Sequence, residues 1–126
     1  IDLLSEQSLK KTVELTKTLV NSIISSDEYG FAAAVSGLGR DRNEIKQTLA
    51  MLDKQVRDAA VIASGVSTDK IGCYPEGAYR LSEKITTSQA VKIHESINRA
   101  WYGIETNANA VLILTALCTE IASVCC

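Results

Sequence analysis

The sequence has few of the residues that interrupt helices. Its 126 residues include one proline and seven glycines. Strands are usually short and bounded by such residues, whereas helices need long uninterrupted segments. Apolar residues make up 46% of the chain and charged residues 22%, a composition that excludes an intrinsically disordered protein. We therefore expect one all-α domain over residues 1–126.

The chain also lacks a concentration of charge of one sign and a long hydrophobic run. The formal net charge is −2, and the basic residues are interspersed with acidic ones. A nucleic-acid partner is not expected, because binding to phosphates requires a basic surface. The longest stretch without a charged residue runs from Thr106 to Thr119 and contains two asparagines. A membrane span needs about 20 apolar residues, so none is predicted.

Metal ligands are scarce as well. Histidine occurs once, and no two of the four cysteines have the C-x-x-C spacing. The common zinc sites need several such ligands, so no metal and no other cofactor is expected.

The cysteines favour an oxidising compartment, because their number is even and the chain is small. We predict a secreted protein stapled by disulfides. Four free thiols in a cytosolic protein are the alternative. A bridge from the cysteine in the middle of the chain to one of the three C-terminal cysteines would join a loop to the last helix, and Cys126 is the candidate for a bond between two chains. The four are Cys73, Cys118, Cys125 and Cys126.

Apolar residues at three- and four-residue steps predict four long helices and one or two short ones, which is typical of a four-helix-type bundle. The clearest helix follows Asp41, because Asp41 and Glu44 have capping-box spacing. Thr86 and Gln89 have the same spacing before a later helix. The expected segments are residues 2 or 5 to 24, 27–36, 41–65, 76–83, 86 to a break between 103 and 109, and 109–124.

A break between Gly103 and Asn109 is part of this prediction. A helix that continued from Ser88 to Cys125 would be about 57 Å long, too long to pack along its length in a domain of this size. The helix after the break has the widest apolar arc, so we expect it to be the most buried helix.

The sequence shows no catalytic machinery. His94 is the only histidine, and no G-x-S-x-G motif or E-x-x-H pair accompanies it. A lone histidine without a positioned partner is typical of a structural residue, and we expect its ring to pack beside Trp101. The chain is therefore predicted not to be an enzyme.

Four of the six aromatic residues lie between positions 74 and 102, where they would rim a ligand pocket or cap one end of the core. The rest of the core has few large side chains, so its helices must pack closely or leave a cavity. We predict a binding protein that holds a small apolar ligand between its helices. The alternative is a protein that self-associates, as a disulfide-linked homodimer, or binds a protein partner. The candidate ligand-binding residues are Trp101, Tyr79, Tyr102, His94 and Leu117.

Overall fold

A computed structural model describes residues 3–37, 41–65, 74–106 and 109–125, with side chains from residue 10 onward and up to residue 124. Within these ranges the fold is all-helical, with six helices and no strand, as predicted. The predicted turn at residues 37–39 and the connection at 65–77 fall largely outside the described residues. The helices are α1 (Leu3–Ile24), α2 (Glu28–Ser36), α3 (Arg42–Ala63), α4 (Pro75–Lys84), α5 (Thr87–Glu105) and α6 (Ala110–Cys125).

Local capping signals explain where these helices begin. The side chain of Asp41 accepts hydrogen bonds from the first backbone N–H groups of α3, at 2.9 Å from Asn43. The predicted capping box of α5 is complete, because the side chains of Thr86 and Gln89 each accept a bond from the other's backbone N–H, at 3.1 and 2.8 Å. These side chains satisfy donors that a helix start leaves without partners. The predicted break between α5 and α6 is also confirmed.

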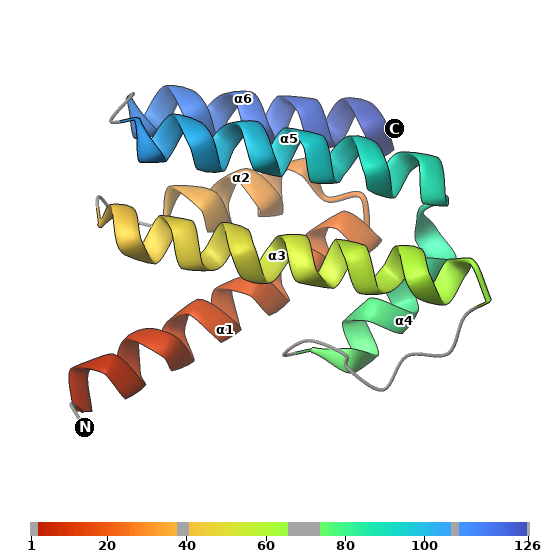
Figure 1. Cartoon of the computed structure of the whole chain (residues 1–126), viewed down its shortest axis with the longest axis horizontal. Helices are drawn as coiled ribbons and strands as arrows, with labels where there is room; N and C mark the ends of the chain where they lie inside the picture. Colours follow the sequence, from red (N-terminus) through yellow and green to blue (C-terminus); the bar gives the residue numbers. More distant parts are fainter. Residues whose placement is uncertain (1–2, 38–40, 66–73, 107–108, 126) are drawn as a thin grey trace.

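The helices are arranged around α3 (Figure 1). α3 packs against α1, α4 and α5. α5 lies between α3 and α6, and the three run alternately in opposite directions. α1 crosses obliquely, and the short α2 packs against α1 and α6. α3 therefore has neighbours on three sides, whereas α6 packs mainly against α5 and α2.

The predicted apolar stripes of α3 and α5 form the centre of the core. Ile45 and Val56 of α3 and Ile93 of α5 are completely buried. Burial at this density accounts for most of the stabilisation in a small domain. The other buried members of the two stripes are Leu49, Leu52, Ala59, Ala90, Ile97, Ala100 and Ile104.

A buried glutamine joins α3 to the start of α4. Gln55 is fully buried, and its side-chain amide donates to the carbonyl oxygen of Tyr74 at 2.7 Å. Its side-chain oxygen accepts a bond from the backbone N–H of Tyr74 at 3.2 Å. Tyr74 directly precedes α4 and has no side-chain cap of its own. Gln55 therefore satisfies the backbone at a helix start that the local sequence leaves uncapped.

The prediction that α6 is the most buried helix is wrong. Three described residues of α6 are buried, namely Leu114, Leu117 and Ile121, against eight in α3. Val111 and Leu112 are 72% and 69% exposed. The apolar arc of α6 is wider than the surface that α5 and α2 cover, because α6 lies at the edge of the assembly.

Candidate functional site

A large groove lies between α2 and α6. Its volume is about 760 Å³, and we call it the α2/α6 groove. Val35 and Leu114 are buried and form its floor, and Cys118 is half-buried. The remaining lining residues are Ala32, Ser36, Arg42, Asn109, Ala110, Val111, Thr115 and Thr119.

Small residues explain why the groove lies on the α2 side of α6. Gly103 lets α6 approach α5 closely, since a Cβ atom there would lie 2.6 Å from Cδ1 of Ile113. On the other side, the groove is lined by Ala32 and Ala110, whose methyl groups do not reach across it. The helix that is held against α5 therefore leaves an uncovered apolar surface facing α2.

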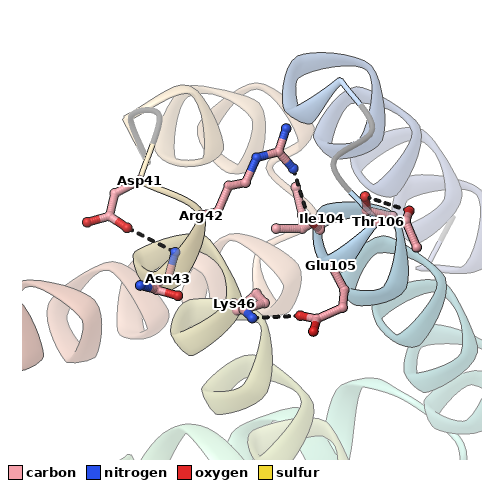
Figure 2. A network of polar contacts seen from close by, with 8 residues as sticks. Asp41, Arg42, Asn43, Lys46, Ile104, Glu105 and Thr106 are labelled. Carbon is pink, nitrogen blue, oxygen red and sulfur yellow. Dashed lines mark hydrogen bonds and ion pairs between the residues drawn. The ribbon is translucent and has the colours of Figure 1, made fainter.

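Arg42 lines one end of the α2/α6 groove. Arg42, at the first position of α3, reaches the end of α5, where its Nη1 donates to the carbonyl oxygen of Ile104 at 2.8 Å (Figure 2). One turn later, Lys46 pairs with Glu105 at 2.6 Å. These contacts fix the start of α3 to the end of α5 and hold the half-buried guanidinium of Arg42 at the groove.

Cys118 is a free thiol that lines the α2/α6 groove. Burial raises the pKa of its thiol above the usual value, so little thiolate is present at neutral pH. The predicted disulfide stapling is therefore not shown at Cys118. Cys73, Cys126 and the side chain of Cys125 lie outside the described part of the structure.

The structure brings together only some of the predicted ligand-binding residues. Trp101 and Tyr102 line a second groove of about 280 Å³ between α3 and α5, together with Asp53. The rings of Trp101 and Tyr102 meet edge to face, with their centroids 5.7 Å apart. The ammonium group of Lys46 lies 5.3 Å from the centroid of the Trp101 ring, in a cation–π contact.

The other two hydrophobic candidates lie elsewhere. Tyr79 is exposed on α4, which packs against α3 and α1 rather than beside the Trp101 groove. Leu117 is buried in the core, where it lines none of the cavities described above. Sequence spacing places residues on a helix but does not place helices beside each other, which is why Tyr79 and Trp101 were expected to share a site.

His94 has a positioned partner that the sequence did not reveal. Its Nδ1 lies 2.5 Å from Oδ1 of Asp53 on α3, so the histidine is oriented by a carboxylate rather than only by packing beside Trp101. An imidazole held by a carboxylate is one part of an acid–base device. Among the described residues, no serine, threonine or cysteine is hydrogen-bonded to this imidazole.

Within the described ranges, no three His, Cys, Asp or Glu side chains lie close enough to hold a metal ion. No described helix is both long enough and apolar enough to cross a membrane.

No family model matches the chain, and neither a curated protein nor a solved structure is similar to it.

The residues of the α2/α6 groove were missed at the sequence level. Two signals were present. Val111 lies outside the apolar arc expected to face the core, and α2 contains the alanine run 32–34. An apolar residue on the expected outer face of a helix, opposite a helix of small residues, is the pattern that indicates such a groove.

Proposed function

We propose that this protein is a non-catalytic binding protein that holds a small apolar ligand in the α2/α6 groove. The observation that carries the proposal is the size and lining of the groove. Its volume of about 760 Å³ is within the range of small-molecule sites, which are also mostly apolar with a few polar groups. A ligand there would cover Val111, which is otherwise exposed to water.

Binding without catalysis agrees with the distribution of titratable groups. The Asp53–His94 pair belongs to α3 and α5, and neither residue lines the α2/α6 groove. The thiol of Cys118 does line it, but burial raises its pKa, which weakens it as a nucleophile. Among the lining residues that the structure describes, no acid–base pair therefore meets a ligand.

Secretion and disulfide bonds form the second part of the proposal. Because Cys118 carries a free thiol, a bridge within the chain would join Cys73 to Cys125 or Cys126. The remaining cysteine would be available for a bond between two chains. Thiol alkylation of the denatured protein, with and without reductant, counts the bonded cysteines by mass. Four alkylated thiols without reductant would contradict the disulfides.

A titration with a neutral fluorescent apolar probe, N-phenylnaphthylamine, tests the binding site. Ala32 and Ala33 are neighbouring exposed alanines of α2, but only Ala32 lines the groove. We expect Ala32→Phe to fill the groove and weaken probe binding by at least about tenfold, or about 1.4 kcal/mol. Ala33→Phe is the matched control and leaves binding unchanged.

Two results would contradict this assignment. One is an absence of saturable binding to the unmodified protein, and the other is an equal loss of binding in both variants. Native mass spectrometry of the untreated protein gives a second readout, because a ligand retained from the source adds mass to the monomer and is lost on denaturation.

The exposed apolar residues of α6 support a second candidate function, which is self-association. Val111 and Leu112 are adjacent and largely exposed, and exposed apolar patches mark contact surfaces when they are large enough. Sedimentation at several concentrations tests this. A dimer that Leu112→Ser dissociates, and that the control Val91→Ser on α5 leaves intact, favours self-association over the carrier.

A further inference from the structure

The hydroxyl groups that line the α2/α6 groove donate their protons to the backbone of their own helices. Thr115 donates to the carbonyl oxygen of Val111 at 2.7 Å, and Thr119 donates to that of Thr115 at 3.1 Å. Ser36, at the end of α2, donates to the carbonyl oxygen of Ala33 at 2.8 Å. A hydroxyl group has one proton, but its lone pairs can still accept hydrogen bonds. These side chains therefore offer a ligand acceptor oxygens rather than donor protons.

The strong hydrogen-bond donors among the described lining side chains belong to Arg42 and Asn109. Arg42 already has partners within the protein, one of which is the carbonyl oxygen of Ile104. Asn109 accepts a bond from the backbone N–H of Leu112 through its side-chain oxygen, at 3.3 Å, and its amide group remains a donor at the start of α6. Thr115 lies six residues farther along, or about 9 Å of helix. The lining therefore changes along α6, from a donor near its start to acceptor oxygens beyond it.

Thr115 and Thr119 lie one turn apart on α6, and we call them the threonine pair. Four residues of helix rise by about 6 Å, so the two hydroxyl oxygens serve neighbouring positions along the groove. Val111 lies one turn before Thr115, and the buried Leu114 precedes Thr115 in the sequence and forms part of the floor. A molecule that covers Val111 and Leu114 therefore has the threonine pair at its border.

We infer that the ligand of the α2/α6 groove is a neutral apolar alcohol whose hydroxyl group donates to the threonine pair. This inference rests on the function proposed above and specifies the ligand class. The carbon skeleton covers Val111 and Leu114, and the hydroxyl proton meets an acceptor oxygen. A ketone of the same shape has no proton to donate, so it places one acceptor against another. The ligand is neutral because the one charged residue among the described lining residues, Arg42, is engaged within the protein.

Displacement of N-phenylnaphthylamine by menthol and by menthone tests this assignment. The two molecules have the same carbon skeleton, and they differ in whether one carbon bears a hydroxyl group or a carbonyl oxygen. We expect menthol to bind about fivefold more tightly, which corresponds to about 1 kcal/mol and is the net contribution of one hydrogen bond.

Three variants locate the hydrogen bond. The double variant Thr115→Val/Thr119→Val keeps the shape of both side chains and removes both acceptors. It should lower the affinity for menthol to that for menthone, while an unchanged affinity for menthone shows that the groove is intact. Thr115→Ser/Thr119→Ser keeps the hydroxyl groups and should retain the preference. Thr18→Val is the matched control, because Thr18 is an exposed threonine of α1 that donates to the carbonyl oxygen of Glu14 and lies outside the groove.

The outcomes separate this inference from the proposed function. If menthone binds as tightly as menthol, and Ala32→Phe weakens both, the apolar site stands and the alcohol assignment is overturned. If the preference for menthol survives in the double valine variant, or is lost equally in Thr18→Val, the threonine pair is not its source and the assignment also fails. If N-phenylnaphthylamine itself shows no saturable binding, the groove is not a ligand site and both proposals fail.

Discussion

The contrast between α3 and α6 shows that the hydrophobicity of a helix does not fix its burial. α6 is the more apolar of the two, and it has no basic residue and a single acidic one, Glu120. α3 contains many charged and polar residues, yet eight of its residues are buried. The difference comes from position, since α3 packs against three helices and α6 lies at the edge of the assembly.

The two helices also differ in another respect, because α3 buries polar side chains whereas α6 exposes apolar ones. In α3, the buried Gln55 and Asp58 have partners, with Lys54 binding Asp58 at 2.6 Å and Gln55 bonded twice to Tyr74. α6 instead has apolar side chains that no other helix covers, and they border the α2/α6 groove. A buried polar group needs a fixed partner, whereas exposed apolar surface gains from any apolar cover. The first arrangement stabilises the fold, and the second leaves apolar surface uncovered.

Shortening one buried leucine in α3 and one in α6 should give the largest difference in the free energy of unfolding. We expect Leu52→Ala in α3 to lower the free energy of unfolding by about 3 to 4 kcal/mol, because it opens a closed cavity in the core. Leu114→Ala should cost about 2 kcal/mol, since the lost side chain borders an open groove and leaves no closed cavity. Urea unfolding of both variants measures the two values. Equal losses would contradict the distinction between a closed core and an open edge.

The buried glutamine of α3 should have the next largest effect. Gln55→Ala removes the side-chain partners of both the N–H and the carbonyl group of Tyr74. We expect the free energy of unfolding to fall by about 2 kcal/mol, which is the cost of leaving buried polar groups without partners. Gln47→Ala, at an exposed position of the same helix, is the control and should change stability by less than about 0.5 kcal/mol. Thermal and urea unfolding give the comparison. A loss no larger than that of the control would show that Gln55 does not hold the start of α4.

The smallest effect is expected on the outer face of α6. Leu112→Ser should change the free energy of unfolding by no more than about 0.5 kcal/mol, because the side chain is already exposed. The measurement is made at low protein concentration, where the chain is monomeric. A destabilisation comparable to that of Leu114→Ala would mean that Leu112 is covered in solution, and would favour self-association.

The starts of helices and the buried faces of α3 and α5 could be predicted from the sequence. Asp41 and Thr86 act on backbone groups within one turn, and a stripe such as Ile93 and Ile97 repeats within one helix. These signals depend on neighbours three or four residues away. The break before α6 was predictable for another reason, since it required only the length of a helix and the size of a domain.

Tertiary structure alone decided the candidate site. The α2/α6 groove is lined by Ala32, Arg42 and Val111, three residues from three helices. The Asp53 partner of His94 likewise lies on another helix. Which apolar face stays uncovered depends on how the helices pack, and Gly103 influences this by bringing α6 against α5. The sequence determined the helices and their apolar faces, because those follow from local chemistry. Packing between distant segments decided which of those faces was left uncovered.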